Sequence, residues 1–448
     1  MPAPDLDPAL DLGPAVPAPV APPVPDLTHV VVVGAGLAGA RTMVELRAQG
    51  FTGRVTVLGA ETVPPYDRPP LSKHLVDRPA PAWLSDELAV DALGLADAVR
   101  LGTPATGLEV ADDGVVVRVV DGEVTADAVV LATGAAAVRP AVWDGVRTLH
   151  TAADARALRD GLGLGVGSGG TGGRRLVVIG AGWIGAEVAT VAAAAGVDVT
   201  VVEALATPLS GALGKRVGAL TVPWFAAAGV HLVTGVPVAS VGPLGSTDGT
   251  VVALSDGTVL TADVVLAAVG ARPATGWIGD ALPREPGGAV RVDEGHAPVG
   301  GSARVRAVGD VALRRSARHG WVPGGHWDAA LRGPAVAVGA LLGTADPAAT
   351  DLAPYVFSTQ LGHELGLYGL PGAADEVLLR GDPAGPTGAG WSALWFAPGT
   401  DRLTAVLAVD RPRDVAGARR LFGRAELPVL DRARATDPGV LLPATVRD

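Results

Sequence analysis

Two copies of one strand-turn-helix-strand pattern constrain this chain more than any other feature of its sequence. In the first copy, residues 29–33 (HVVVV) predict a buried strand, residues 40–49 a helix, and residues 55–58 the next strand. The second copy has predicted strands at 176–180 and 197–203, separated by a helix over 186–195. A unit repeated in this way predicts an α/β fold with two Rossmann-like dinucleotide-binding domains.

Each copy carries three glycines in the turn between its first strand and its helix. The first glycine of such a turn allows a tight bend, the second lets a pyrophosphate approach the backbone, and the third lets the helix pack on the strand. Because the chain contains 62 glycines, the alternative is a glycine-rich connection that binds no nucleotide. The six glycines are Gly34, Gly36 and Gly39 in the first copy, and Gly180, Gly182 and Gly185 in the second.

An acidic residue stands near the end of the second strand in each copy, where a carboxylate binds ribose hydroxyls. These residues are Glu61 and Glu203. Two dinucleotide sites in one chain predict FAD held close to a nicotinamide, with hydride passing between them. Glu203 would repel a 2′-phosphate, and the next cation along the chain is Lys215, so we expect NADH in preference to NADPH.

Composition excludes several other classes of protein. The 448 residues carry a net charge of −11, which argues against a nucleic-acid partner. No cysteine is present, so disulfide scaffolds, thiolate metal sites and cysteine redox chemistry are excluded. The eight histidines have no metal-ligand spacing, and we expect no metal. No clean apolar stretch of about 18 residues occurs and no signal peptide is visible, so we expect a cytoplasmic protein without membrane insertion. The sequence leaves the oligomeric state open.

Segment composition predicts the domain boundaries. Residues 1–27 are rich in Pro and Ala and are expected to form a disordered tail, and Gly161–Gly173 is expected to be a flexible loop. The FAD-binding domain is expected to comprise residues 28–139 and 269–345, interrupted by an NADH-binding domain at 140–268. Residues 346–448 are expected to form a C-terminal α+β domain.

A run of motifs resembles one known family. Residues 65–73 (PYDRPPLSK) resemble the segment after the first unit in FAD-dependent NADH:ferredoxin reductases of the putidaredoxin reductase and biphenyl dioxygenase reductase type, whose fold is that of glutathione reductase. Further motifs are similar in the same order. They are ATG at 132–134, GAGWIGAE at 180–187, AVGARP at 268–273, AVGD at 307–310, His326-Trp327 and the segment 354–360.

The resemblance implies roles for individual residues. Lys73 would lie beside flavin N5 and pair with Glu187, and these two are the expected catalytic residues. Lys73 and Lys215 are the only lysines of the chain, and a compact ammonium can approach N5 more closely than a guanidinium. The alternatives are a solvated surface lysine and an ordinary acid in the first turn of a helix. The expected cofactor-binding residues are the six glycines, Glu61, Glu203, Lys73 and Glu187, together with Leu37, Ala38, Arg68, Ala105, Thr133, Gly134, His150, Trp183, Ile184, Val269, Gly270, Asp310 and Trp327.

Three of these roles have open alternatives. By resemblance, Asp310 accepts hydrogen bonds from the ribityl hydroxyls, although it could be a plain N-cap. Arg68 could contact the flavin pyrophosphate or neutralise Asp67. The Trp327 backbone would contact the pyrimidine edge of the flavin, unless the residue belongs to the core.

The chain also departs from the family pattern at several positions near the flavin ring. His150 stands where Arg is usual, and Phe357 stands where Trp is usual. Ala329 and Gly333-Pro334 replace an Asn and a Gln-Gly, and Ala135–Ala137 delay the usual Arg-Pro to positions 139 and 140. These changes predict weaker polar contacts with the ring and leave the phosphate-binding turns intact.

A flavin without a partner thiol must pass its electrons to an external acceptor. By resemblance the acceptor is a small acidic [2Fe–2S] ferredoxin that serves a cytochrome P450 or a ring-hydroxylating oxygenase. Arg314, Arg315 and Arg318 are the candidate docking patch, with a solvated loop as the alternative. Two other functions stay open, namely a reductase for rubredoxin, quinone or another acceptor, and a flavoprotein homologue that has lost turnover and acts as a binding partner.

Overall fold

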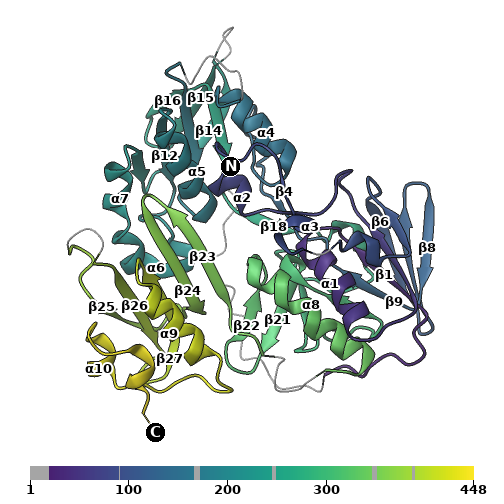
Figure 1. The fold of residues 1–448 in the computed structure, drawn as a ribbon. Helices are drawn as coiled ribbons and strands as arrows, with labels where there is room; N and C mark the ends of the chain where they lie inside the picture. The colour runs from purple at the N-terminus through teal and green to yellow at the C-terminus, as the bar shows by residue number, and fades with distance from the viewer. Residues whose placement is uncertain are drawn as a thin grey trace.

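The computed structural model describes residues 20–89, 91–165, 172–244, 249–345, 351–385 and 389–447. Figure 1 shows three lobes around a central gap. The first unit and the long helix α8 form one lobe, the second unit forms another, and the last part of the chain forms the third. Residues 166–171, which make up much of the predicted flexible loop, lie outside the described residues.

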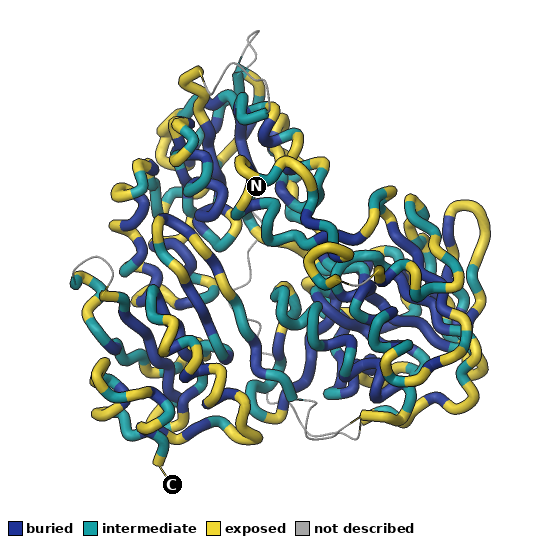
Figure 2. The backbone as a smooth tube through the Cα atoms, viewed as in Figure 1, coloured by how far each residue is buried: buried dark blue, intermediate teal, exposed yellow. Residues whose placement is uncertain are grey.

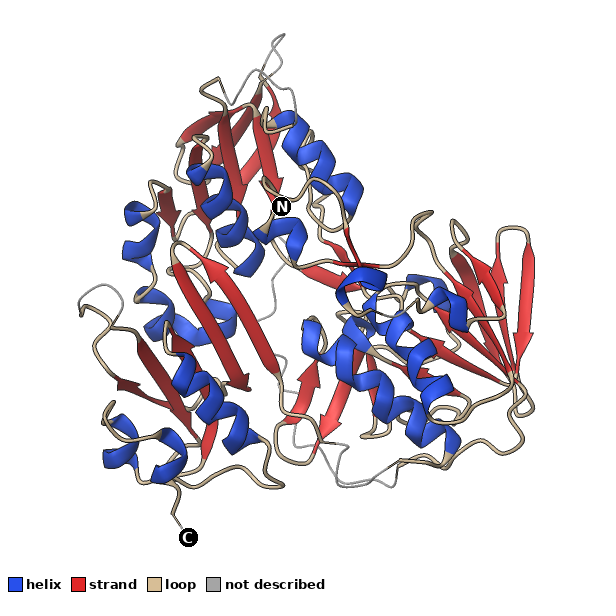
Figure 3. Ribbon diagram, viewed as in Figure 1, coloured by secondary structure: helices blue, strands red, loops and turns tan. Residues whose placement is uncertain are grey.

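A parallel sheet organises the first lobe. Its strands follow the order β20-β9-β1-β2-β5, so a strand from residues 305–307 closes a sheet that begins at residue 29. Helices α1 and α8 pack together and cover this sheet. Figure 3 shows both helices in front of the strands. The bounds are β1 His29–Val33, β2 Arg54–Leu58, β5 Ala98–Arg100, β9 Ala128–Leu131, β20 Val305–Ala307, α1 Leu37–Ala48 and α8 Trp327–Leu342.

A second parallel sheet repeats this plan in the order β13-β12-β11-β17. In each unit, the glycine turn is followed by a helix that lies against the parallel sheet of that unit. The short antiparallel strands β10 Ala135–Ala137 and β18 Ala271–Pro273 pair where the chain passes between the two lobes. The bounds are β11 Arg175–Ile179, β12 Asp198–Glu203, β13 His231–Thr234, β17 Val264–Ala267, α5 Trp183–Ala194, α6 Ser210–Ala219 and α7 Val222–Ala227.

The third lobe is an antiparallel sheet in the order β23-β24-β27-β26-β25. Strand β23 is an edge strand, and it lies beside α5 of the second lobe. The bounds are β23 Tyr355–Gln360, β24 His363–Gly369, β25 Glu376–Arg380, β26 Trp391–Phe396, β27 Leu403–Val409, α9 Pro412–Phe422 and α10 Arg432–Thr436.

Smaller elements complete the lobes. Two antiparallel three-stranded sheets, β6-β7-β8 and β14-β15-β16, accompany the first and second parallel sheets, and β19-β21-β22 lies near α8. Their bounds are β6 Ala105–Val110, β7 Val115–Val119, β8 Gly122–Ala126, β14 Val238–Pro243, β15 Thr250–Leu254, β16 Val259–Ala262, β19 Val290–Val292, β21 Ala312–Ser316 and β22 Gly320–Pro323. The others are β3 Tyr66–Asp67, β4 Ala82–Trp83, α2 Pro70–Lys73, α3 Leu84–Glu87 and α4 Ala152–Gly161.

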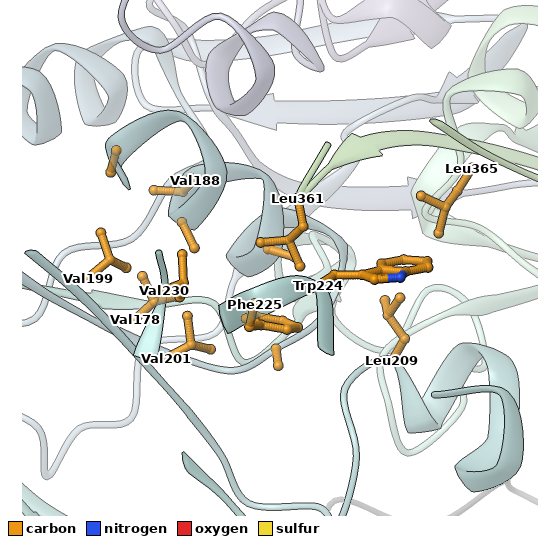
Figure 4. Packing of buried hydrophobic residues seen from close by; sticks show 14 of the residues in the cluster. Val178, Val188, Val199, Val201, Leu209, Trp224, Phe225, Val230, Leu361 and Leu365 are labelled. Atoms are coloured by element: carbon orange, nitrogen blue, oxygen red, sulfur yellow. The ribbon is translucent and has the colours of Figure 1, made fainter. Parts of the chain in front are cut away.

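One hydrophobic core joins the second lobe to the third. Val188 on α5 packs with the strands of the second sheet, and Trp224 and Phe225 on α7 extend the cluster to Leu361 and Leu365 of the third lobe (Figure 4). Figure 2 shows this continuity as buried backbone that runs from one lobe into the next. Burial of this kind fixes β23 against the second lobe, because non-polar area removed from water stabilises the contact at about 25 cal/mol per Å².

The predicted fold class is confirmed: two parallel α/β units are followed by an α+β segment. The prediction of a disordered tail is wrong for residues 20–27. Val24 is buried and donates its backbone N–H to the Leu341 carbonyl at 3.0 Å, and the Ala21 N–H binds Asp293 at 2.8 Å. Proline removes donors from this segment, yet the N–H groups of Ala21 and Val24 find partners on the first lobe. Residues 1–19 lie outside the described residues. Among the helices of the described ranges, none is long and apolar enough to cross a membrane.

Candidate functional site

A cavity of about 860 Å³ lies where the first unit, the start of α5 and strand β23 meet. Its size and mixed lining are those of a cofactor site. Many of the predicted cofactor-binding residues line it, namely Gly34, Gly36, Leu37, Ala38, Glu61, Arg68, Lys73, Ala105, Thr133, Gly134, His150, Trp183, Ile184, Glu187, Asp310 and Trp327. Gly39, Gly180, Gly182, Gly185, Glu203, Val269 and Gly270 do not line this cavity.

The geometry of the first glycine turn fits a bound dinucleotide. Gly34 has φ of +115°, and a Cβ atom there would lie 2.1 Å from the Ala132 carbonyl oxygen. A Cβ at Gly39 would lie 1.8 Å from the Gly34 carbonyl oxygen, so these two positions require glycine for packing. At Gly36, by contrast, an added Cβ would meet nothing within 4 Å. This open space at the start of α1 adjoins the cavity, where helix N–H groups can bind phosphate.

The second turn repeats these three relations. A Cβ at Gly180 would lie 2.4 Å from the Ala268 carbonyl oxygen, one at Gly185 would lie 2.0 Å from the Gly180 carbonyl oxygen, and one at Gly182 would meet nothing within 4 Å. Glu203, at the end of β12, accepts hydrogen bonds from the N–H groups of Ala181 and Leu205, each at 2.8 Å. Its carboxylate is thus held beside the turn, as a ribose-binding acid must be.

Lys73 and Glu187 form an ion pair at the wall of the cavity. Lys73 ends the short helix α2 of the first unit, whereas Glu187 lies just after the first turn of α5 of the second. Their side chains are only 14% and 5% exposed, so Lys73 is not the solvated surface lysine of the alternative interpretation. Glu187 is paired with a residue of another unit and is not an ordinary first-turn acid. The predicted pairing is therefore present, and the place of Lys73 relative to a flavin stays a prediction.

Arg68 forms its ion pair with Glu61, and not with the neighbouring Asp67 that was the alternative to a flavin pyrophosphate. Its guanidinium pairs with Glu61 at 2.8 Å and donates to the His150 carbonyl, so it does not neutralise Asp67. Tyr66 donates its hydroxyl to Glu61 at 2.7 Å. Burial, followed by the nearby charge of Arg68, lowers the pKa of His150 to about 4, so its imidazole is neutral at pH 7.

Asp67 and Trp327, two further lining residues, contact each other. The Trp327 indole N–H donates to Asp67 at 2.7 Å, and burial raises the pKa of this carboxyl. Trp327 lines the cavity and makes an edge contact with Phe357, with ring centroids 6.0 Å apart, so it is not simply a core residue. Asp310 accepts the Gly325 N–H at 3.0 Å, and burial raises its pKa. It belongs to a single 3-10 turn and caps no helix with its side chain.

The predicted docking patch of Arg314, Arg315 and Arg318 is wrong. The three side chains are 9%, 3% and 8% exposed. Arg314 and Arg318 pair with Asp351, and Arg315 pairs with Glu294 at 2.5 Å. Strand β21 carries the first two into the interior of a small sheet, where carboxylates distant in sequence neutralise them.

Comparison with known proteins identifies the fold. Residues 28–334 match the pyridine nucleotide-disulphide oxidoreductase family, and residues 355–446 match the reductase C-terminal family. The chain belongs to the pyridine nucleotide-disulphide oxidoreductases. In this family member no cysteine is present, so no disulphide can take part in its chemistry.

The family resemblance noted in the sequence is confirmed by individual relatives. The ferredoxin–NAD(+) reductase subunit of the benzene 1,2-dioxygenase system from Pseudomonas putida is 33% identical over 411 residues, which cover 88% of this chain and 92% of that protein. The ferredoxin–NAD(+) reductase component of the anthranilate 1,2-dioxygenase system from Burkholderia cepacia is 34% identical over 426 residues, which cover 92% and 97%. Putidaredoxin reductase, solved in covalent complex with putidaredoxin, has a TM-score of 0.82 at 28% identity, over 93% of this chain and 98% of that chain.

Sequence reasoning missed several residues of this oxidoreductase site. The hydroxyls of Ser72 and Ser358 each donate to Glu187 at 2.5 Å. The ring of Phe357 lies against Lys73, with the ammonium 5.3 Å from its centroid. All three residues stand inside motifs that carried the resemblance, but no local pattern indicates which side chain they contact.

Proposed function

We propose that this chain is an NADH:ferredoxin reductase that binds FAD and supplies electrons to a [2Fe–2S] ferredoxin of a P450 or ring-hydroxylating oxygenase system. The relatives named for dioxygenase systems support the choice of acceptor. The observation that carries the proposal is the Lys73–Glu187 pair, because it joins the two dinucleotide-binding units at one cavity. An intact pair also favours the catalytic function over a homologue that has lost turnover.

Different residues of the chain have different roles in such a reaction. The first glycine turn and the N-terminus of α1 bind the FAD phosphates, while the second turn and Glu203 bind NADH. FAD, when bound, accepts hydride and releases the electrons singly. Lys73 places a positive charge on one wall of the cavity, and Glu187 holds that charge in place. Trp183 and Ile184, at the start of α5, bring the second unit to the same cavity.

Three further assignments belong to this proposal. The acid at Glu203 supports NADH over NADPH. The pairing of β20 with β9 supports a discontinuous FAD domain of residues 28–139 and 269–345, with an NADH domain at 140–268 between them and a C-terminal domain from 346. A cytoplasmic location is supported by a chain without cysteine, which suits a reducing compartment.

The proposal predicts a yellow protein whose flavin is reduced by NADH. We expect the purified chain to show the absorbance of oxidised FAD, and anaerobic addition of NADH to bleach it rapidly, with NADPH much less effective. Adding an acidic [2Fe–2S] ferredoxin should then restore the absorbance. If only a quinone or rubredoxin restores the absorbance, that molecule and not a ferredoxin is the acceptor. A folded protein that cannot be reconstituted with FAD would favour the non-catalytic homologue.

Helix α9 offers a docking surface in place of the buried arginines. Arg413, Arg419 and Arg420 lie on its exposed face, and within the described ranges none of the three makes an ion pair. Helix α9 packs against strand β24, whose neighbour β23 carries Tyr355, a residue of the cavity lining. Arginines without an ion pair on the exposed face of this helix suit an acidic partner, although the whole chain is negative.

Reversing these charges should impair the ferredoxin step alone. We expect Arg413→Glu, Arg419→Glu and Arg420→Glu together to raise the KM for an acidic ferredoxin roughly tenfold or more at low salt, since long-range attraction between the proteins is lost. Flavin reduction by NADH should be unchanged. The matched control makes the same charge change at exposed arginines elsewhere, Arg54, Arg156 and Arg402. Equal effects of the two sets would show that net charge, and not the α9 surface, governs docking.

A further inference from the structure

The Lys73–Glu187 pair is held by a strand of the C-terminal lobe. Helix α2, helix α5 and strand β23 meet at this point, and they come from the first unit, the second unit and the C-terminal lobe respectively (Figure 1). Glu187 is 4% exposed, and its carboxylate has three donors. One oxygen accepts from Lys73 and from the Ser358 hydroxyl, and the other accepts from the Ser72 hydroxyl.

The Ser358 hydroxyl is oriented toward Glu187 by its own surroundings. Ser358 is 2% exposed, and its oxygen accepts a hydrogen bond from the Gln360 amide at 3.2 Å. A hydroxyl has a single proton, so this acceptor contact leaves the proton free for Glu187, to which the oxygen approaches within 2.5 Å. Hydrogen bonds between a hydroxyl and a carboxylate are of this short, charge-assisted kind.

Strand β23 contacts the other member of the pair as well. Phe357, the neighbour of Ser358, places its ring 5.3 Å from the Lys73 ammonium. Leu361, which directly follows the end of β23, donates its backbone N–H to the Thr190 hydroxyl of α5 at 2.7 Å. The strand therefore lies along α5 and contacts both the acid and the base, which limits how far either can move.

We propose that Ser358 is a positioning residue for flavin reduction: by fixing Glu187 from the C-terminal lobe, it holds the Lys73 ammonium at the cavity wall. Ser358 itself does not line the cavity, whereas its partner Glu187 does. Its effect passes through Glu187, and the strength of the effect depends on the hydroxyl and not on the volume of the side chain. This proposal rests on the proposed function.

Removing the hydroxyl should slow flavin reduction without weakening acceptor binding. In holoenzyme carrying Ser358→Ala, we expect the rate constant for flavin reduction at saturating NADH to fall roughly tenfold, since small displacements of a positioned group have effects of this size. The midpoint potential of the bound flavin should become more negative, because a displaced ammonium stabilises reduced flavin less. The KM for ferredoxin should be unchanged. Ser358→Thr retains the hydroxyl, so its rate constant for flavin reduction should lie within about twofold of that of the unchanged protein.

A second buried serine provides the control. Ser392 on β26 of the same sheet donates to the buried carboxylate of Asp414 at 2.8 Å, far along the sheet from the cavity. Ser392→Ala should lower the melting temperature without changing the reduction rate or the potential. Ser358→Ala combined with Glu187→Gln should be no slower than Glu187→Gln alone, because the route through the carboxylate is already lost.

Two results would overturn the inference. One is additive losses in the Glu187→Gln background, which would mean that Ser358 does not act through Glu187. The other is equal impairment in Ser358→Ala and Ser358→Thr, which would assign the effect to packing, and this comparison decides the matter even if the alanine variant is unstable. Failure of the proposed function looks different, because NADH would then leave the flavin of the unchanged protein oxidised.

Discussion

A Gly36→Val protein is expected to fold and to purify without FAD. Gly36 has φ of −81° and ψ of −164°, a conformation open to any residue, and an added Cβ atom would meet nothing within 4 Å. The free energy of unfolding of the apoprotein should fall by no more than about 1 kcal/mol, because valine is a poorer N-cap than glycine. The same side chain would fill the space that the pyrophosphate needs, so we expect FAD affinity to drop by roughly 100-fold or more.

Two measurements separate these effects. Thermal unfolding of the apoprotein reports the fold, and titration with FAD, followed by quenching of flavin fluorescence, reports the affinity. Gly34→Ala is the contrasting variant, because its Cβ would lie 2.1 Å from a backbone oxygen and should destabilise the first unit itself. A Gly36→Val protein that binds FAD normally would show that the pyrophosphate does not approach this turn.

The sequence predicts the parts of this site that depend on local chain geometry. Both glycine turns, their flanking strands and the acid Glu203 lie where the pattern places them, because strand, turn and helix are specified by neighbouring residues. Lys73 and Glu187 are 114 positions apart, and their pairing was predicted only through the resemblance to a family. No periodicity or spacing in the chain would have joined them.

The failed predictions share a physical cause. A run of arginines such as Arg314 to Arg318 has no local sign of burial, since the acids that neutralise it, Glu294 and Asp351, reach it through the tertiary fold. Of the two alternatives left open for Arg68, neutralisation of its neighbour Asp67 is likewise excluded by the tertiary fold, because Arg68 pairs with Glu61 and Asp67 accepts from Trp327. Composition also suggested disorder at residues 20–27, where hydrogen bonds to the first lobe hold the backbone.

The contacts of Ser72 and Ser358 belong to the same class. Ser72 precedes Lys73 and Ser358 follows Phe357, two residues that the sequence singles out. The partner of each serine is nevertheless settled only when α2 and β23 approach α5. Hydroxyls are common and have no spacing rule that identifies a carboxylate partner. Such residues are found from the fold, where burial makes an unpaired hydroxyl costly and so indicates that a partner is present.

A Gly182→Val protein is expected to keep its FAD and to lose reduction by NADH. Gly182 matches Gly36 in its backbone, with φ of −81° and ψ of −169°, and an added Cβ atom also meets nothing within 4 Å. The valine would instead occupy the pyrophosphate position of the second site, so we expect the rate of flavin reduction at a fixed low NADH concentration to fall roughly 100-fold or more. Dithionite, which needs no nucleotide site, should still bleach the flavin fully, and this serves as the internal control.

The Gly36→Val and Gly182→Val variants thus make the same change in two equivalent turns and should give opposite phenotypes, one without flavin and one with flavin that NADH cannot reduce. Normal reduction of Gly182→Val by NADH would refute the assignment of the second turn to the nicotinamide nucleotide.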